Sequence, residues 1–314
     1  MDGTTLDELD MKILNVLTRN SRVSYNTLGK EIGLTAKSVK ARVKKMQSGG
    51  IFGNFIARVN PSVLGYSKFW LVYVKKSKRD EKHIQQSLGL LGDILYRAES
   101  LGNPLAFLLA IKEEAEEKFD LLVDVLGQAF VEKQVISFPS VSEQPTYTDL
   151  RIIRCLLANP RMEISDISRK ISMSSKTVAR RLDKMIENRI LEFSTEVNPV
   201  AMRGYIVSVV SAHIEKAAYV AIPESGFVKD AFFLYSPWHS QNMIYWLCCT
   251  KDVFVLDSVV KALESYLGVR KVDISFPIHK EYYEEVVTKN IQRRLQKGEA
   301  DSKLLVQQIE RNRR

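Results

Sequence analysis

The feature that most constrains the fold of this chain is an internal repeat. The segment that starts at Asp10 aligns with the segment that starts at Asp149, and the order of matching residues is preserved over about 130 positions. The coinciding pairs include Ile13/Ile152, Leu17/Leu156, Asn20/Asn159, Arg22/Arg161, Ile32/Ile171, Lys37/Lys176, Val39/Val178, Arg42/Arg181, Lys45/Lys184, Met46/Met185 and Ile51/Ile190. Near the far end of each copy, Ile136–Pro139 matches Ile274–Pro277. We conclude that the chain is a tandem duplication, so each fold element is expected twice.

Length and composition limit the possible classes of protein. The 314 residues are 45% hydrophobic and 26% charged, which is ordinary globular usage. No segment has the run of about 20 apolar residues that a membrane helix needs, and no signal peptide is visible at the start. The three cysteines are too few for a disulfide framework, which favours a reducing cytoplasm. The net charge of +9 suits a polyanionic partner.

Each copy begins with a three-helix pattern. In the first copy, the apolar positions that define the helices are Ile13, Leu14 and Leu17, then Leu28 and Ile32, then Val39, Val43 and Met46. Gly33 suits a turn that needs a positive φ, and Thr35 is a good N-cap for the third helix. Gly49-Gly50 ends that helix, and Phe52–Val59 is expected to form a strand pair or wing. The pattern predicts a winged helix-turn-helix in each copy.

The second part of each copy predicts a βαββαβ order, the order of a ferredoxin-like sandwich. The first copy supplies strands or helices near 69–74, 82–91, 94–99, 105–111, 113–126 and 131–138. The second supplies them near 205–213, 215–220, 232–235, 244–249, 253–267 and 269–276. The expected fold is therefore α+β, with two winged helix-turn-helix domains (1–66 and 140–205) alternating with two ferredoxin-like domains (67–139 and 206–279), before a charged helical tail (280–314).

The third helix of each copy carries the strongest chemical signal. With its apolar side turned inward, the first copy leaves lysines and the small Ala41 on the outer side, and the second copy repeats the arrangement. Cations can neutralise phosphates, and small residues allow close approach to base edges in the major groove. A solvated helix face explains one such pattern, but two occurrences after the same helix-turn-helix pattern favour DNA binding.

The sequence resembles the Lrp/AsnC (feast/famine) family of transcription regulators. The resemblance rests on Leu6–Leu14, on Ile32–Val43, on Gly50-Ile51, and on Asn60-Pro61 with Leu64–Tyr66. The resemblance occurs in both copies of the repeat, which together make up nearly the whole chain, whereas a usual family member has one copy. It implies that Thr35–Met46 is a recognition helix and that the ferredoxin-like part oligomerises and binds effectors.

The expected partners are double-stranded DNA, a second copy of the two-copy chain in a homo-oligomer, and a small-molecule effector. We expect no membrane partner, cofactor, metal site or catalytic residues. The predicted DNA-binding residues are Arg22, Thr35, Lys37, Ser38, Lys40, Ala41, Arg42, Lys44 and Lys45 in the first copy, and Ser174, Ser175, Lys176, Thr177, Ala179, Arg180 and Lys184 in the second. Because Ala179-Arg180 stands where the first copy has Lys40-Ala41, the two heads are expected to read different half-sites.

Effector binding is the least specific prediction. The family pattern has a Gly-x-Tyr/x-Asp turn in its effector domain, but here Pro104-Leu105 follows Gly102 and Asn103. The second copy has no such turn and places Trp238 and His239 in the corresponding loop. These four residues, Gly102, Asn103, Trp238 and His239, are the candidate effector contacts.

Three further features were weighed. Fused two-copy chains of this architecture also occur among sirohaem decarboxylases, so a tetrapyrrole enzyme is the alternative function, with His213, His239, Arg97 and Arg270 as its candidate residues. The cysteine pair Cys248-Cys249 ends an apolar run and predicts buried packing rather than a thiol switch. The tail from Lys280 carries a sparse apolar stripe at helical spacing, which predicts a docked helix or a helix that pairs with another chain. A second DNA-binding arm is the less favoured alternative, in which Arg311–Arg314 would touch phosphate.

Overall fold

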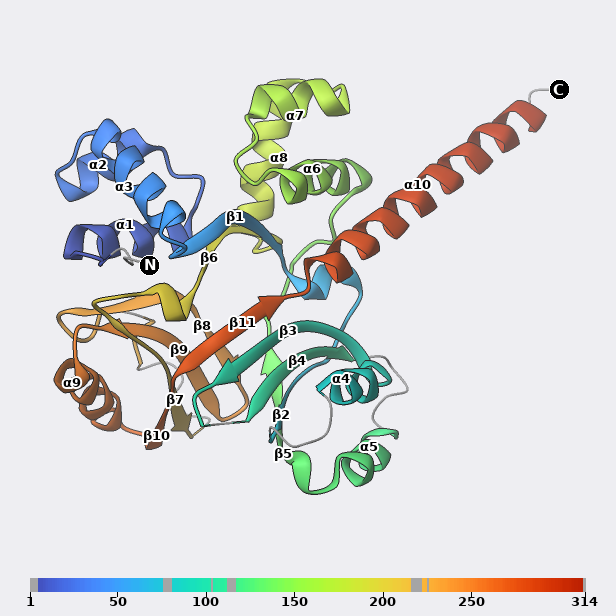
Figure 1. Cartoon of the computed structure of the whole chain (residues 1–314). Coiled ribbons are helices and arrows are strands. Elements are labelled where there is room, and N and C mark those ends of the chain that lie inside the picture. The colour runs from blue at the N-terminus through green and yellow to red at the C-terminus, as the bar shows by residue number, and fades with distance from the viewer. Residues whose placement is uncertain are drawn as a thin grey trace. The chain divides into compact units, whose positions relative to one another are not determined.

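The computed structural model describes residues 5–75, 81–102, 104–111, 117–215, 222–224 and 226–312 (Figure 1). The chain forms two compact units, each built from several stretches of sequence. The sheet unit contains Met1–Ile56, Tyr66–Phe138 and Phe193–Tyr282. The helical unit contains Ala57–Gly65, Pro139–Glu192 and Tyr283–Arg314.

The first three-helix head, head 1, belongs to the sheet unit. It consists of α1 (Glu8–Arg19), α2 (Tyr25–Ile32) and α3 (Ala36–Ser48), as the sequence predicts. Asp7 and Asp10 form a capping box at the start of α1, because each carboxylate accepts the other residue's backbone N–H. Gly33 ends α2 at φ 74°, the left-handed conformation expected of the turn.

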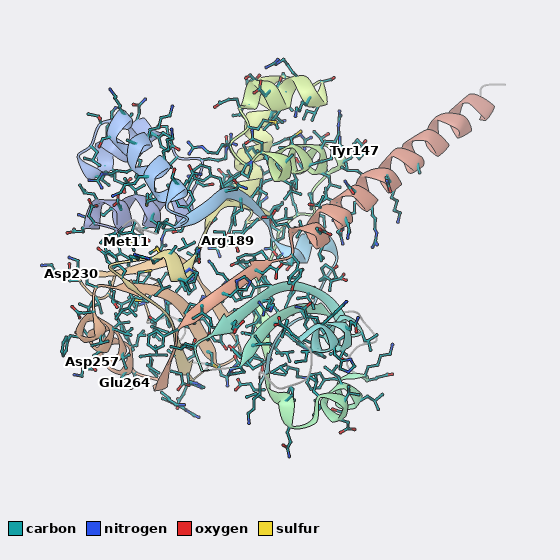
Figure 2. The ribbon with its side chains drawn as sticks, in the orientation of Figure 1. Met11, Tyr147, Arg189, Asp230, Asp257 and Glu264 are labelled. Carbon is teal, nitrogen blue, oxygen red and sulfur yellow. The ribbon has the colours of Figure 1, made fainter. Side chains whose placement is uncertain are left out.

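The second head, head 2, lies in the helical unit and repeats this plan. It consists of α6 (Tyr147–Ala158), α7 (Ile164–Ile171) and α8 (Ser175–Glu187). Its turns use side-chain-bearing residues where head 1 uses glycines: Ser172 has φ 53° and Arg189 has φ 54°. Figure 2 labels Arg189 beyond the end of α8.

The strand after each head differs from the prediction of a hairpin within one copy. In the structure, β1 (Phe52–Val59) pairs with β6 (Leu191–Val197), the equivalent strand of the other copy, in a two-stranded sheet. The Thr195 hydroxyl also donates to the Asn54 carbonyl at 3.2 Å. A lone strand must satisfy its backbone N–H and C=O groups, and here the duplicated strand supplies the partner.

The first ferredoxin-like half confirms the βαββαβ prediction. Its strands are β2 (Phe69–Val74), β3 (Gly92–Ser100), β4 (Leu105–Ile111) and β5 (Phe130–Ser137), and its helices are α4 (Glu81–Gly89) and α5 (Phe119–Leu126). The strands pair in the antiparallel order β5-β2-β4-β3. One face buries Trp70, Phe107 and Leu109 with residues of both helices.

The second half has the same strand order, β10-β7-β9-β8. Its elements are β7 (Ile206–Ile214), β8 (Ala231–Ser240), β9 (Met243–Thr250), α9 (Val253–Glu264) and β10 (Val269–Ser275). Its buried cluster includes Phe233, Trp246 and Val259, which joins the sheet to α9. The helix predicted at 215–220 lies almost wholly outside the described residues.

The two halves form one nine-stranded antiparallel sheet. They join where β5 pairs with β8, with Ile136 opposite Ser240 and Ser137 opposite His239. The Tyr245 hydroxyl on β9 also donates to Gln134 on β5. The far edge is completed by β11 (Pro277–Tyr282), which pairs with β3 and which the sequence analysis did not predict.

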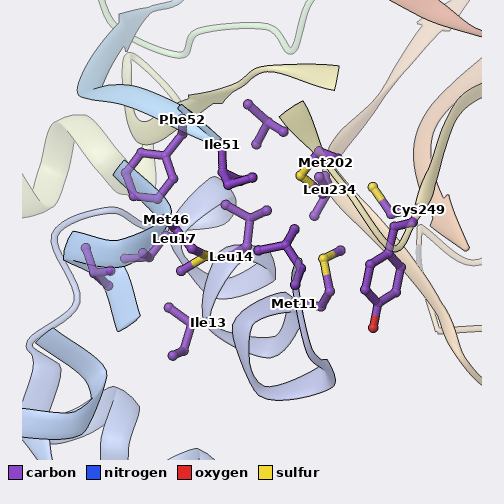
Figure 3. Close-up of a cluster of buried hydrophobic side chains, with 14 of the residues drawn as sticks. Met11, Ile13, Leu14, Leu17, Met46, Ile51, Phe52, Met202, Leu234 and Cys249 are labelled. Atoms are coloured by element: carbon purple, nitrogen blue, oxygen red, sulfur yellow. The ribbon is translucent and has the colours of Figure 1, made fainter. Parts of the chain in front are cut away.

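The core of head 1 continues into the sheet of the second copy. Met11, Leu14 and Leu17 of α1 pack in one buried cluster with residues of the second copy that include Leu234 and Cys249 (Figure 3). The helix α1 therefore rests on the sheet through apolar contacts, and burial at roughly 25 cal/mol per Å² makes such contacts the main source of stability.

The tail forms a long helix, α10 (Glu284–Asn312), which packs on α6. Residues 280–282, which were predicted to belong to this helix, lie in the strand β11 instead. Its residues Ile291 and Leu295 are 1% and 2% exposed.

Short 3-10 helices η1 (Pro61–Leu64), η3 (Gly127–Ala129) and η4 (Pro199–Ala201) complete the described elements. Within the described residues, none of the helices combines the length and the apolar character needed to span a membrane.

Candidate nucleic-acid interface

The third helix of each head is fixed by an apolar face. In α3, Val39, Val43 and Met46 are at most 2% exposed, and in α8 the equivalent Val178, Leu182 and Met185 are at most 3% exposed. Burial of the same three positions in both copies confirms the predicted orientation of each helix. The opposite face is therefore turned to solvent.

The exposed face of α3 is cationic. Lys37, Lys40, Lys44 and Lys45 are exposed together with Ala41, and Ser38 is half-buried. Within the described part of the chain, no carboxylate forms an ion pair with these four lysines. A group of unpaired ammonium groups on one helix creates a positive potential that attracts polyanions.

The exposed face of α8 has the same character with a different pattern. Lys176, Arg180 and Lys184 are exposed, as are Ser174 and Ser175, whereas Thr177 and Ala179 are half-buried. The Lys184 ammonium lies 2.6 Å from the Glu143 carboxylate, but both side chains are more than half exposed, so the pair is weak. This face therefore also offers cations to a polyanion.

Two of the predicted contacts also set where the recognition helices begin. The Thr35 hydroxyl accepts the backbone N–H of Ser38 at 3.1 Å, and the Ser174 hydroxyl accepts that of Thr177 at 3.1 Å. Each hydroxyl caps its helix and satisfies a donor that would otherwise be unpaired. These two residues thus have a structural role that needs no ligand.

Arg42 has a role within the fold, which the sequence analysis missed. Its guanidinium donates to the carboxylates of Asp7 and Asp10, both at 2.7 Å, and the Asp10 side chain is fully buried. The contact ties α3 to the start of α1. In head 2, Arg181 makes the equivalent contact with Asp149 at 3.1 Å. The signal in the sequence was the acid at position 10, which stands among the apolar residues of the first helix.

Arg22 is placed beside the strand that follows head 2. Its guanidinium lies 5.1 Å from the centre of the Phe193 ring, a cation–π distance, and its side chain is half-buried. Arg22 therefore supports the contact between head 1 and β6, and only part of its surface is available to a ligand.

The candidate effector residues do not share one face. The prediction of a loop at Trp238 and His239 was wrong, because both lie in β8, where they pair with Tyr245 and Ile244 of β9. Neighbouring residues of a strand point to opposite faces, so the two side chains diverge. The Trp238 ring contacts the Tyr96 ring, with 5.2 Å between the ring centroids. His239 is partly buried, and this burial lowers the pKa of its imidazole. Gly102 occupies the turn between β3 and β4 at φ 65°, and Asn103 lies outside the described residues.

The cysteine pair is buried, as predicted. Cys248 and Cys249 are both 0% exposed, and they belong to different core clusters on the two faces of the sheet. Burial raises the pKa of Cys248 to about 12 and that of Cys249 well above its ordinary value, so both thiols stay protonated and unreactive. Among the described residues, no group of three His, Cys, Asp or Glu side chains could hold a metal ion.

Comparison with known domain families matches both heads. Residues 6–47 match the AsnC-type helix-turn-helix domain, and residues 145–192 match a winged helix-turn-helix DNA-binding domain. These matches cover the first, second and third helices of each head.

Several proteins are similar to one copy of the repeat. The HTH-type transcriptional regulator Ptr1 of Methanocaldococcus jannaschii is 34% identical over 131 residues, which cover 39% of this chain and 87% of that protein. The HTH-type transcriptional regulator FL11 of Pyrococcus abyssi is 26% identical, over 39% of this chain and 81% of that protein.

Among solved structures, the siroheme decarboxylase NirDL aligns with 94% of this chain and 100% of its own, at 14% identity and a TM-score of 0.49. The transcriptional regulator NMB0573 of Neisseria meningitidis, in complex with L-Met, aligns with 42% of this chain and 88% of its own, at 24% identity and a TM-score of 0.31.

Proposed function

Because this chain belongs to the Lrp/AsnC family of helix-turn-helix regulators, we propose that it is a sequence-specific transcription regulator that binds double-stranded DNA through both of its heads. The observation that carries the proposal is the pair of recognition helices, α3 and α8. Each has a buried apolar face and an exposed cationic face. An α-helix of this kind fits the major groove, where side chains reach base edges and cations neutralise phosphates.

Two heads in one chain have a consequence for the DNA site. Once one head is bound, the second binds intramolecularly, at a raised effective concentration. Since the chain is duplicated rather than dimerised from identical subunits, its heads are free to differ, and α3 carries Lys40-Ala41 where α8 carries Ala179-Arg180. We therefore infer that the preferred site has two non-identical halves.

The proposal also includes association with a second copy of the chain and modulation by a small molecule. Sedimentation velocity of the free chain tests the first, with a dimer as the expected species. A change of melting temperature on adding single amino acids tests the second.

The alternative is a tetrapyrrole enzyme like the sirohaem decarboxylases. It would use basic and histidine side chains toward the carboxylates of the ligand. Two of its four candidates are held by carboxylates of this chain: Arg97 by Glu81 and Glu99, and His213 by Asp273. The pair of Arg270 with Glu215 is exposed and weak. These contacts favour the regulator. An absorption spectrum recorded on adding sirohaem separates the two functions, because binding to a tetrapyrrole enzyme would shift the Soret band of the sirohaem.

The experiment that tests DNA binding compares two variants, in each of which three cations of one head are replaced by alanine. A DNA fragment is first selected from a genomic library by the parent chain, and its affinity is then measured at several salt concentrations. The head 1 variant is K37A/K40A/K44A and the head 2 variant is K176A/R180A/K184A. Each lost phosphate contact should flatten the slope of log affinity against log salt by up to about 0.9.

A control variant that removes cations outside the heads keeps the test specific. K261Q/K271Q removes two exposed cations of the second ferredoxin-like half, where each is paired with a carboxylate. The control should bind as the parent does. Unchanged affinity and slope in both head variants would rule out binding through α3 and α8.

A further inference from the structure

The tail helix α10 docks on η1 and on α6 of head 2 through one face. Ile291 and Leu295 are buried, the Asn290 amide donates to the Leu64 carbonyl at 3.2 Å, and the Arg294 guanidinium donates to the Val63 carbonyl. One turn further on, a Cβ added to Gly298 would lie 2.9 Å from the Tyr147 ring of α6. This close approach needs glycine, so the contact between α10 and α6 is a built interface rather than a passing one (Figure 2 labels Tyr147).

The opposite face of α10 is cationic. Lys289, Arg293 and Lys297 are all exposed and are spaced four residues apart. At about 100° per residue they fall within an arc of about 80°, on the side of the helix away from Ile291, Leu295 and Gly298. No acidic residue occurs between 286 and 298. We call Lys289, Arg293 and Lys297 the α10 cationic face.

Among the described residues, most of this charge has no counter-charge. Lys289 pairs with Glu285 at 3.1 Å, but both side chains are more than two-thirds exposed and the pair is weak. In the described part of the chain, neither Arg293 nor Lys297 has an ion pair or a side-chain hydrogen bond. Like charges four residues apart on a helix repel each other and lower its stability. A polyanion bound along this face would remove that repulsion.

We propose that the α10 cationic face is an additional DNA-contacting surface, which binds the phosphate backbone next to the half-site of head 2. The proposal rests on the proposed function. Because α10 packs on α6, and α6 in turn packs on the recognition helix α8 within the same compact unit, the face is held at a fixed distance from the helix that reads the bases. Lysine and arginine on an exposed helix suit phosphates and add affinity with no sequence preference.

This inference predicts an asymmetric footprint. The tail lies outside the repeat, so head 1 has no equivalent of α10 in sequence. Protection of the DNA backbone should therefore extend beyond the half-site on the side of head 2. The half-site of head 2 is identified as the one whose protection is lost in K176A/R180A/K184A.

The test is the double variant R293Q/K297Q in the full chain, with K261Q/K271Q as the control that removes the same net charge elsewhere. Glutamine keeps a high helix propensity, and both positions are exposed, so the melting temperature should not fall. The loss of two phosphate contacts should flatten the salt slope by about 1.8. A fourfold rise in salt would then cost R293Q/K297Q about twelvefold less affinity than it costs the parent. Hydroxyl-radical protection should shorten on the head 2 side alone.

A slope and footprint equal to those of the parent would overturn this inference while leaving the proposed function in place. An equal fall of slope in the control would also overturn it, because net charge would then be the cause. If the parent itself selects no DNA, the proposed function fails instead, and the two failures are distinguishable.

Discussion

The two heads have the same three helices but differ in what supports them. The core of head 1 runs without interruption from Met11 and Leu14 into Met202 and Leu234 of the second copy, so the head and the sheet share one apolar cluster. Head 2 belongs to the helical unit, where the tail helix α10 packs on its first helix α6. The two copies thus share the cationic face of the third helix but differ in its support.

The heads also differ at the backbone positions that end their helices. Head 1 has Gly33 and Gly50 at φ 74° and 70°, where glycine is unstrained. Head 2 has Ser172 and Arg189 at φ 53° and 54°, a conformation that costs on the order of 1 kcal/mol for a residue with a Cβ. Head 2 therefore stores backbone strain that head 1 does not.

The largest expected difference concerns the cores. L14A and the equivalent I153A each remove a fully buried side chain and should lower the free energy of unfolding by about 2–5 kcal/mol. Calorimetry should show that L14A lowers the melting transition of the sheet unit, because Leu14 shares its cluster with the sheet. I153A should lower only the transition of the helical unit. The shared core would be contradicted if L14A left the sheet transition in place.

The next effect concerns the arginine that ties the third helix to the first. R42A leaves the buried Asp10 carboxylate without its partner, and loss of a charged hydrogen bond in such a site should cost about 2–3 kcal/mol. R181A should cost less, since its contact with Asp149 is longer, at 3.1 Å. Urea denaturation measures both. Below the melting range, R42A should keep the salt slope of DNA binding, and a flattened slope would instead make Arg42 a phosphate contact.

The smallest effect tests the strained turns. S172G and R189G should each stabilise head 2 by less than about 1 kcal/mol, because the freedom that glycine adds to the unfolded chain offsets part of the gain. The reverse changes G33S and G50R should each cost head 1 about 1 kcal/mol. A Cβ at Gly33 or Gly50 meets no other atom within 4 Å, so these variants measure the cost of the backbone conformation without a steric clash. If all four variants had the same free energy of unfolding as the parent chain, the turns would carry no strain.

Local patterns made the heads predictable from the sequence. The cap Thr35 and the buried stripes of α3 and α8 follow from residue spacing within one helix, and the structure confirms them. The succession of strands and helices along the sequence of each ferredoxin-like half follows in the same way. Such features depend on neighbours in sequence, which a single chain displays.

Pairings between the copies were not predictable. The partnership of β1 with β6, the joining of β5 to β8 and the addition of β11 to β3 are all contacts between distant segments. All of β11 after Pro277 lies beyond the matched residues of the repeat, so the first copy gave no equivalent strand to compare. The role of Arg42 was missed for a similar reason, because a lysine-rich helix face gives no sign that one cation is held by carboxylates of another helix.

The central claim is that one chain reads DNA with two different heads. Hydroxyl-radical footprinting of the selected fragment tests it most directly, with the parent, K37A/K40A/K44A and K176A/R180A/K184A side by side. The account predicts that the parent protects two half-sites and that each variant loses protection of a different one. Loss of the same half-site in both variants, or full protection in both, would contradict it.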